Sequence, residues 1–356
     1  MGNKYSMMKV FHFKDKIDSL PLENPEIQPP LHIRIKPINA CNHSCAYCAY
    51  RAKDLQLGKD MNISDSIPRE KMLEIVDDII NMGVKAITFS GGGEPLFYPH
   101  MAEVLRRLAS SPVKFATLTN GALLKGEVAE FFALNGSWVR ISMDGWDNAS
   151  YTNYRGCPDG EYDRILSNIR NFKKFDGPCH LGVNYVVDKT NVGHVFEAAS
   201  RLKDAGVDNL KISACIIDND GAKNNAYHDT FFDQAREQVA RVQEELGEPG
   251  FEIFDAYHLE DDCFDKDYSW CPFLQIRPVI GADQNVYSCQ DKAYNLDEGL
   301  IGSIKDVRFK DFWMNDKEKF FRINPSKICK NHCVANSRNK MLHEYFGTDL
   351  DHLGFV

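Results

Sequence analysis

Residues 31–48 read LHIRIKPINACNHSCAYC, and this stretch indicates both the fold and the chemistry. Its first seven residues alternate between apolar and polar side chains, which is typical of a β-strand with one buried face. Cys41, Cys45 and Cys48 follow with the spacing CxxxCxxC. Three thiolates this close can bind three irons of a [4Fe-4S] cluster and leave the fourth iron open to a small molecule. A zinc site or three unrelated thiols are the alternatives; zinc normally takes four ligands, and the nearby candidate is His43.

Strand and helix patterns alternate along the chain as far as residue 246. Five further strands are predicted at 85–90, 113–118, 138–142, 181–187 and 210–217. Helical patterns fill the intervals at 68–82, 100–110, 125–134, 162–175, 192–205 and 229–246. Six strand–helix units in series predict an α/β fold with a parallel sheet, and six are too few for a closed eight-unit barrel.

The composition is that of an ordinary globular protein, with 43% apolar and 26% charged residues. A net charge of −9 argues against a nucleic-acid binder, which usually carries a basic surface. The chain contains no apolar run near the ~18–20 residues needed to cross a bilayer, and its first twenty residues lack the apolar core of a signal peptide. We therefore expect a cytoplasmic protein without a membrane partner.

Eleven cysteines are many for a cytoplasmic chain, where thiols stay reduced and serve metal binding or catalysis. Seven fall into two groups, namely Cys41, Cys45 and Cys48 near the start and Cys271, Cys289, Cys329 and Cys333 near the end. The scattered ones are Cys157, Cys179, Cys215 and Cys263. Most of these four are expected to be small buried hydrophobes.

A second motif, SGGGEP at residues 90–95, follows the second predicted strand. A glycine run at the end of a strand lets the backbone come close to a ligand. CxxxCxxC with Tyr47 before its last cysteine, followed by this run, resembles the signature of radical S-adenosylmethionine (radical SAM) enzymes. The resemblance implies a partial (β/α)6 TIM-like barrel and a [4Fe-4S] cluster that binds S-adenosylmethionine and reductively cleaves it to a 5′-deoxyadenosyl radical, which abstracts hydrogen from the substrate.

The resemblance also implies which residues contact S-adenosylmethionine. The glycine-rich motif is expected near its methionine amino group, through Gly91, Gly92, Gly93, Glu94 and Pro95. Polar residues at later strand ends are further candidates, namely Asn120, Ser142, Asp144, Arg155, Asn184 and Ser213. Arg155 matches an arginine that binds the S-adenosylmethionine carboxylate in several relatives, and a surface ion pair is the alternative. For Asp144 the alternative is a turn beside Gly145.

The C-terminal cysteines flank a predicted hairpin at residues 275–288. A hairpin with cysteines, followed by a close cysteine pair, resembles the truncated SPASM ("twitch") domain of radical SAM enzymes. This implies one auxiliary [4Fe-4S] cluster bound by Cys271, Cys289, Cys329 and Cys333, with zinc as the alternative. Cys263 is expected to be free. The predicted domains are an N-terminal extension (1–30), a barrel (31–250), the auxiliary domain (251–340) and a tail (341–356).

A fully ligated auxiliary cluster suits electron transfer, so we predict an oxidoreductase or epimerase acting on a carbinol of a sugar, cyclitol or nucleotide sugar. An epimerase needs a hydrogen donor, and Cys157 is the candidate. A maturase of a ribosomal peptide or protein side chain and a non-enzymatic electron carrier are the alternatives. The family chemistry further implies an electron donor such as flavodoxin or ferredoxin.

Overall fold

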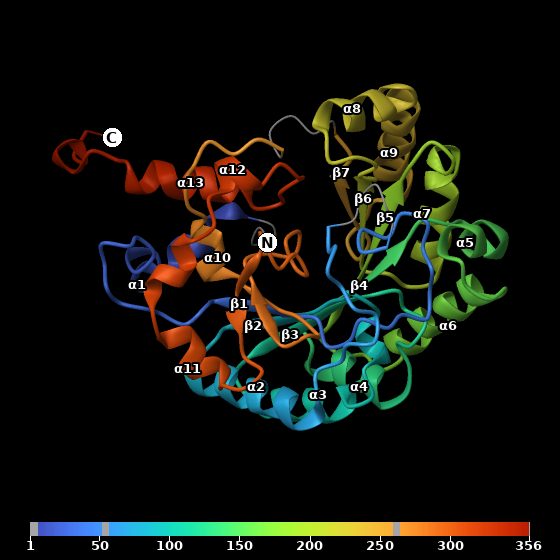
Figure 1. The fold of residues 1–356 in the computed structure, drawn as a ribbon. Coiled ribbons are helices and arrows are strands. Elements are labelled where there is room, and N and C mark those ends of the chain that lie inside the picture. Colours follow the sequence, from blue (N-terminus) through green and yellow to red (C-terminus); the bar gives the residue numbers. More distant parts are fainter. Residues whose placement is uncertain (1–5, 52–56, 259–263, 356) are drawn as a thin grey trace.

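The computed structural model describes residues 6–51, 57–258 and 264–355 of the 356-residue chain. Its centre is a ten-stranded curved sheet in the order β10-β9-β8-β1-β2-β3-β4-β5-β6-β7 (Figure 1). The strands are β1 (His32–Ile35), β2 (Ala86–Phe89), β3 (Lys114–Thr119), β4 (Trp138–Met143), β5 (His180–Val187), β6 (Asn209–Ala214), β7 (Glu252–Ala256), β8 (Val279–Ile280), β9 (Asn285–Tyr287) and β10 (Leu300–Ser303).

Strands β1 to β7 are parallel and neighbour one another in chain order, as strand–helix units in series require. The partial barrel and all six predicted strands are confirmed. The barrel has one strand more than predicted, because β7 pairs with β6. The parallel sheet therefore continues past the expected domain boundary at residue 250.

Helices connect the parallel strands and cover the outer face of the sheet (Figure 1). They are α2 (Arg69–Met82), α3 (Met101–Ala109), α4 (Gly126–Asn135), α5 (Asn148–Arg155), α6 (Glu161–Lys173), α7 (Val195–Asp204), α8 (Gly221–Asp229) and α9 (Phe232–Leu246), with the 3-10 turns η3 (Pro95–Phe97) and η4 (Val192–His194). Helices α5 and α8 were not predicted, because NASYTNYR and GAKNNAYHD lack apolar periodicity. The side chain of Asp147 caps the start of α5, and that of Asp220 caps the start of α8.

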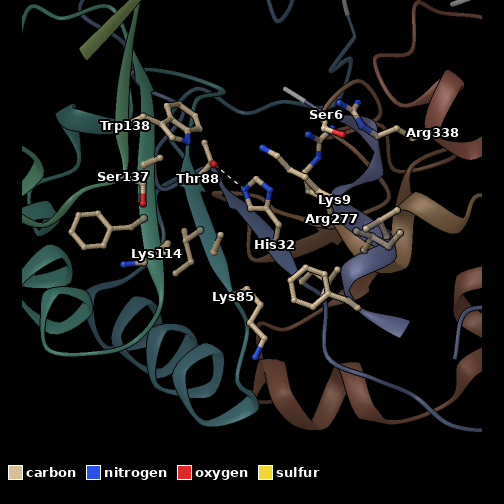
Figure 2. Close-up of a pocket in the computed structure, with 18 of the residues that line it drawn as sticks. Ser6, Lys9, His32, Lys85, Thr88, Lys114, Ser137, Trp138, Arg277 and Arg338 are labelled. Atoms are coloured by element: carbon tan, nitrogen blue, oxygen red, sulfur yellow. Dashed lines mark hydrogen bonds between the residues drawn. The ribbon is translucent and has the colours of Figure 1, made fainter. Parts of the chain in front are cut away.

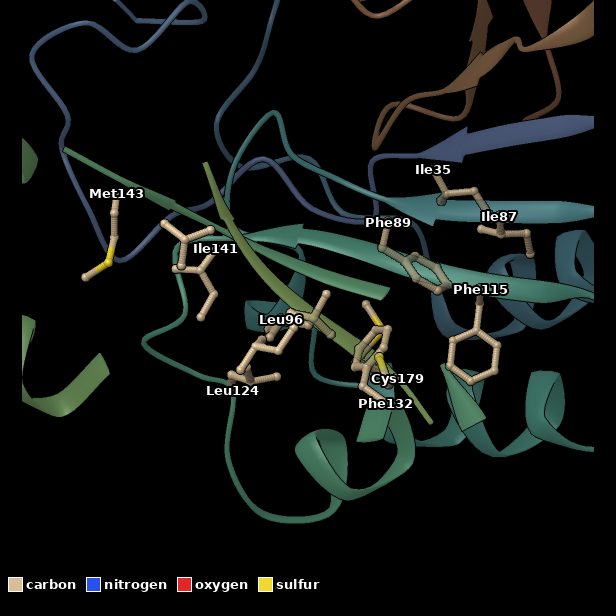
Figure 3. Close-up of a cluster of buried hydrophobic side chains, with 14 of the residues drawn as sticks. Ile35, Ile87, Phe89, Leu96, Phe115, Leu124, Phe132, Ile141, Met143 and Cys179 are labelled. Atoms are coloured by element: carbon tan, nitrogen blue, oxygen red, sulfur yellow. The ribbon is translucent and has the colours of Figure 1, made fainter. Parts of the chain in front are cut away.

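The two faces of the sheet differ in chemistry because side chains alternate along each strand. The outward face carries buried apolar residues such as Ile35, Phe89 and Ile141, which pack against the helices (Figure 3). The inward face is polar and lines a cavity. There, Nε2 of His32 on β1 and Oγ1 of Thr88 on β2 share a hydrogen bond of 2.8 Å (Figure 2). The barrel thus holds its apolar core outside the sheet and its polar groups inside.

The C-terminal residues form a module on the β1 edge of the barrel. The predicted hairpin is confirmed as β8 and β9, and β8 pairs in parallel with β1. The module's helical segments are α10 (Pro272–Ile276), α11 (Phe309–Met314), η5 (Lys317–Phe321), α12 (Pro325–Ile328), α13 (Asn336–Phe346) and η6 (Leu350–His352). The described N-terminal helices, η1 (Met7–His12) and α1 (Lys14–Asp18), pack on this module, where Ile17 and Leu20 contact Ile276 and Leu342. Within the described ranges, every helix is too short or too polar to cross a membrane.

Candidate metal-cluster site

The CxxxCxxC loop leaves the carboxyl end of β1 and is clamped from two sides. On one side, Ser44 N donates to Arg155 O at 2.8 Å and Ala46 N donates to Tyr154 O at 3.1 Å. On the other side, Glu94 N donates to Ala40 O at 3.0 Å. The loop is therefore held by the end of α5 and by the glycine-rich motif, at the strand ends where α/β barrels carry their chemistry.

The three thiols of the loop are close neighbours and partly exposed. Burial raises the pKa of Cys41 to about 11, with Glu94 and Cys45 contributing and a hydrogen bond from the His43 backbone opposing the shift. Burial also raises the pKa of Cys45, to which Cys48 adds and which Arg155 opposes. Neutral thiols are thus favoured at Cys41 and Cys45 in the metal-free protein, and a metal that binds their thiolates must displace the protons.

The glycine-rich motif fits against the cysteine loop so closely that side chains are excluded. A Cβ atom on Gly92 would lie 2.1 Å from Oδ1 of Asn39, and one on Gly93 would lie 1.9 Å from the carbonyl oxygen of Ala40. Both distances are far below van der Waals contact, so the backbone of the motif reaches the cysteine loop because these residues are glycine. The glycine-rich motif therefore packs directly against the cysteine loop, and its contact with S-adenosylmethionine stays a prediction.

The side chain of Glu94 bonds to other parts of the protein, whereas the motif was expected to contact the ligand. Its buried carboxylate accepts from Thr119 Oγ1 at 2.6 Å, Asn120 N at 2.8 Å and Leu96 N at 3.0 Å. Its side chain therefore fixes the end of β3 and the start of η3, where Pro95 is buried. We interpret Glu94 as a positioning residue for the two strand ends.

Asn120 contacts the cysteine loop directly. Its Nδ2 donates to Oδ1 of Asn42 at 2.9 Å, inside CxxxCxxC. Its backbone is held by Glu94, so the end of β3 and the loop form one hydrogen-bonded unit. The structure thus brings this predicted residue to the predicted site.

Arg155 forms a buried ion pair beside the loop rather than the surface pair considered above. Its Nε donates to Asp144 Oδ1 at 2.9 Å, and its Nη2 lies 2.8 Å from Asp144 Oδ2 and 3.1 Å from Ser142 Oγ. Its Nη1 lies 3.6 Å from Cys45 Sγ. Burial alone would lower the pKa of Arg155, but Asp144 raises it well above the ordinary value. A permanent positive charge is therefore fixed at the thiol cluster.

The remaining predicted residues differ in burial: Asn184 and Ser213 are half-buried, and Cys157 is buried. Asn184 and Ser213 meet across β5 and β6, where Ser213 Oγ donates to Asn184 Oδ1 at 3.3 Å. Cys157 is 7% exposed and belongs to the main apolar core, and burial raises its pKa. Its role as a hydrogen donor stays a prediction. Cys263 lies outside the described residues.

His43 is turned toward the protein core. Its Nε2 atom lies 3.1 Å from Oε1 of Glu161 on α6, and both side chains are buried. Burial lowers the pKa of His43, although Glu161 opposes that shift. The imidazole therefore serves the attachment of the loop to α6, and it is poorly placed as the fourth ligand of a zinc site.

The four C-terminal cysteines also form a group. Burial raises the pKa of Cys271 to about 12, with Cys333 and Cys329 contributing, and it raises that of Cys289 well above the ordinary value. Asn339 Nδ2 donates to Cys271 Sγ at 3.3 Å. In the described part of the chain, three or more such side chains nowhere converge around one ion position. A [4Fe-4S] cluster takes one thiolate per iron, so four cysteine donors fit such a cluster, and four thiolates also fit zinc.

A connection between the two cysteine groups was not predicted. Buried Lys36, which follows β1, donates through Nζ to Tyr50 OH at 2.6 Å and to Gly91 O at 2.7 Å. Tyr50 OH donates to Gln290 O at 2.9 Å. Burial lowers the pKa of Lys36 to about 7. Tyr50 lies two residues after Cys48 and Gln290 directly follows Cys289, so a short chain of hydrogen bonds joins the two sites.

Comparison with known proteins identifies a shared domain. The sequence model of the Radical SAM superfamily matches residues 35–191. The chain is 25% identical over 325 residues to the cysteine-type anaerobic sulfatase-maturating enzyme of Clostridium perfringens strain 13, covering 84% of each chain. It is 26% identical over 167 residues to the AdoMet-dependent heme synthase of Methanosarcina barkeri and 24% identical over 279 residues to Fe-coproporphyrin III synthase of the same organism. The match to the heme synthase covers 47% of this chain and 45% of that relative. The match to Fe-coproporphyrin III synthase covers 77% of this chain and 66% of that relative.

Solved structures share the fold over most of the chain. Streptococcus suis SuiB bound to precursor peptide SuiA has a TM-score of 0.62 at 15% identity, covering 89% of this chain and 71% of SuiB. The structure of anSMEcpe with bound AdoMet has a TM-score of 0.55 at 19% identity, covering 89% of this chain and 96% of that one. At these identities the likeness concerns the fold.

Proposed function

Because this chain belongs to the radical SAM superfamily and carries a C-terminal SPASM/twitch-type module, we propose that it oxidises or epimerises a carbinol carbon of a sugar, cyclitol or nucleotide sugar. Its cofactors are S-adenosylmethionine and [4Fe-4S] clusters. When bound at the cysteine loop, these supply the 5′-deoxyadenosyl radical for hydrogen abstraction. Cys41, Cys45 and Cys48 are the proposed ligands of the first cluster.

The chain's own residues prepare that site. Arg155 places a fixed positive charge beside Cys45, which favours the thiolate form that binds iron. Gly92 and Gly93 let the backbone approach, and Asn120 holds the loop from the β3 side. These groups hold the loop in one orientation before any substrate binds.

The observation that carries an oxidative reaction is the second cysteine group and its link to the first. Four thiol ligands leave no open iron, so a cluster bound by Cys271, Cys289, Cys329 and Cys333 suits electron uptake. The hydrogen bonds from Lys36 through Tyr50 to Gln290 connect that module to the barrel. Hydrogen abstraction followed by loss of a proton and an electron gives a carbonyl, and an external one-electron donor such as flavodoxin or ferredoxin would reduce the first site.

A hydroxylated substrate suits the inner face of the barrel. Asn184 and Ser213 from neighbouring strands present amide and hydroxyl groups that can bond hydroxyl groups of a ligand. Epimerisation in place of oxidation would need a hydrogen donor, and Cys157 is the proposed one. Its burial predicts that it donates only after local opening of the segment behind the cysteine loop.

Modification of a peptide or protein side chain is the second candidate. The sulfatase-maturating relative matches over 84% of each chain, and SuiB was solved with its precursor peptide. The two candidates differ in substrate class, so one experiment separates them.

The test measures 5′-deoxyadenosine formed by anaerobically reconstituted protein with dithionite and S-adenosylmethionine. A pool of sugars and nucleotide sugars is compared with a pool of peptides, and a Cys45→Ala variant gives the background. Stimulation by the sugar pool with a product lighter by two hydrogens supports oxidation, and stimulation without mass change supports epimerisation. Stimulation by peptides alone would establish the second candidate and overturn the first.

A further inference from the structure

A cavity of about 680 Å³ lies at the amino ends of the barrel strands (Figure 2). Residues at or directly before the strand starts line it, including Lys85 before β2, Lys114 on β3 and His180 on β5. The cysteine loop follows the opposite, carboxyl end of β1. The cavity volume is in the range of small-molecule sites. The proposed reaction does not account for this space.

The lining is strongly basic in a chain of net charge −9. Among the described residues that line it are three lysines and three arginines but no aspartate or glutamate; the six cations are Lys9, Lys85, Lys114, Arg140, Arg277 and Arg338. Figure 2 shows Lys9, Arg277 and Arg338 on one side of His32 and Lys114 on the other. Cations on opposite walls of one cavity surround any ligand that enters it.

Within the described part of the chain, several of these cations lack a carboxylate partner. Among the described residues, Lys85, Lys114, Arg277 and Arg338 form no ion pair with an acidic side chain. Arg277 and Arg338 both lie over the ring of Phe273, with their guanidinium carbons 4.8 and 5.7 Å from its centre. Arg338 Nη1 also donates to a backbone carbonyl, that of Val334, at 3.0 Å. Two guanidinium groups at one ring leave fork-shaped donors available for an anion.

The mutual repulsion of these cations also favours an anionic ligand. Burial lowers the pKa of Arg277 to about 10, with Arg34 and Arg338 contributing and Asp291 and Cys289 opposing the shift. Burial lowers the pKa of His32 to about 3, with Arg277 and Arg34 contributing. The imidazole is therefore neutral, and its Nε2 is shared with Thr88 Oγ1. An anion bound between the arginines would offset their mutual repulsion.

We propose that this cavity binds the phosphoryl group of a phosphorylated small molecule, with Arg277 and Arg338 as its main ligands. A phosphate dianion matches paired guanidinium forks in both charge and geometry. Trp138 lines the same cavity, and its indole offers a flat apolar face on which the organic part of the ligand can pack. This site is separate from the chemistry at the cysteine loop, so its occupancy can be measured without turnover.

The test is isothermal titration of the reconstituted holoenzyme with inorganic pyrophosphate, with citrate as the carboxylate probe at matched ionic strength. We expect pyrophosphate to bind and the variant R277Q/R338Q to bind it at least tenfold more weakly. Arg170→Gln, on the exposed end of α6, is the matched control and should leave binding unchanged. Equal affinity for citrate, or unchanged pyrophosphate affinity in the double variant, would overturn the proposal.

A second variant guards against loss of folding. Lys85 and Lys114 are exposed at the rim of the cavity, so K85Q/K114Q should keep the fold. We expect it to weaken pyrophosphate binding severalfold and to reduce the dependence of binding on salt concentration. A rim variant that folds normally and binds pyrophosphate like the wild type would also contradict the proposal.

Discussion

Nη1 of Arg155 lies 3.6 Å from the Sγ atom of Cys45, while Nε of the same guanidinium donates to Asp144 at 2.9 Å. One buried side chain thus serves both the ion pair and the thiol. Replacing it with glutamine should cost about 3–5 kcal/mol of unfolding free energy, because the Asp144 carboxylate would be left buried without its cation. Iron content after reconstitution should fall as well, since the thiolate of Cys45 loses a neighbouring positive charge.

The Arg155 prediction can be checked by urea unfolding and by iron analysis of the R155Q protein. Arg322→Gln is the matched control, because Arg322 forms an exposed pair with Asp316 and should change stability by less than about 1 kcal/mol. Arg155→Lys should fall between the two, since it keeps the charge and loses the fork. Wild-type stability and iron content in R155Q would contradict this account.

Gly93→Ala should prevent the cysteine loop from forming its native contact with the glycine-rich motif. The new Cβ would lie 1.9 Å from the carbonyl oxygen of Ala40, directly before Cys41, and a backbone atom cannot move aside as a flexible side chain can. We expect loss of S-adenosylmethionine binding, measured by equilibrium dialysis. Gly193→Ala is the control, because its Cβ would meet nothing nearer than the side-chain Nε2 of Gln234 at 3.5 Å. Normal binding by the Gly93 variant would show that the motif does not need this close contact.

The parallel strands could be predicted because each alternates or runs apolar for four to eight residues and stands between helical patterns. Strand β7 could not, because its sequence EIFDA is half polar and follows a turn, so its place depends on pairing with β6. Among site residues, the two cysteine groups carry a local spacing signal. Lys36 carries none: it reads as the polar position of a strand, and its partners Tyr50 and Gly91 come from distant segments. The basic cavity likewise combines residues from both ends of the chain.

Lys16 predicts a pH dependence of stability. Its side chain is 4% exposed, and burial together with Lys317 lowers its pKa from 10.5 to about 7. Between pH 7 and 10.5 the unfolded chain keeps this proton while the folded chain has lost it, so the folded state gains stability as the pH rises. Lys16→Met removes the ionisable group, so its stability advantage should be largest at or below pH 7. That advantage should shrink by on the order of 3–4 kcal/mol by pH 10.

Urea unfolding of the wild type and Lys16→Met at pH 7, 8.5 and 10 measures this change. The lost hydrogen bond from Nζ to Gln28 O at 2.9 Å adds a constant offset, so the change with pH is the informative quantity. Lys310→Met, at an exposed position, should differ from the wild type by the same amount at each pH. A pH-independent difference for Lys16→Met would show that this lysine is charged in the folded protein across the range.

Removing a pair of auxiliary cysteines should lower iron content without abolishing S-adenosylmethionine binding. Cys329→Ser/Cys333→Ser deletes half of the proposed ligands of the second cluster, so iron should fall from about eight to about four atoms per chain. The barrel motifs remain intact, because Cys41, Cys45 and Cys48 are held by α5 and the glycine-rich motif. Metal analysis that finds one zinc in the wild type, lost in the variant, would contradict a cluster at these positions.

Tyr50→Phe tests whether the link between the two cysteine groups affects the reaction. The hydroxyl accepts from Lys36 Nζ at 2.6 Å and donates to Gln290 O at 2.9 Å, so its removal leaves the buried Lys36 amino group and a carbonyl each short of a partner and should cost about 1–3 kcal/mol. Tyr98→Phe is the matched control, because its buried hydroxyl donates to Ile67 O at 2.8 Å on the helix-covered side. If the link orders the path between the sites, the Tyr50 variant should form more 5′-deoxyadenosine per product than the wild type, and the Tyr98 variant should not. An unchanged ratio with a matched loss of stability in both variants would mean that Tyr50 serves the fold alone.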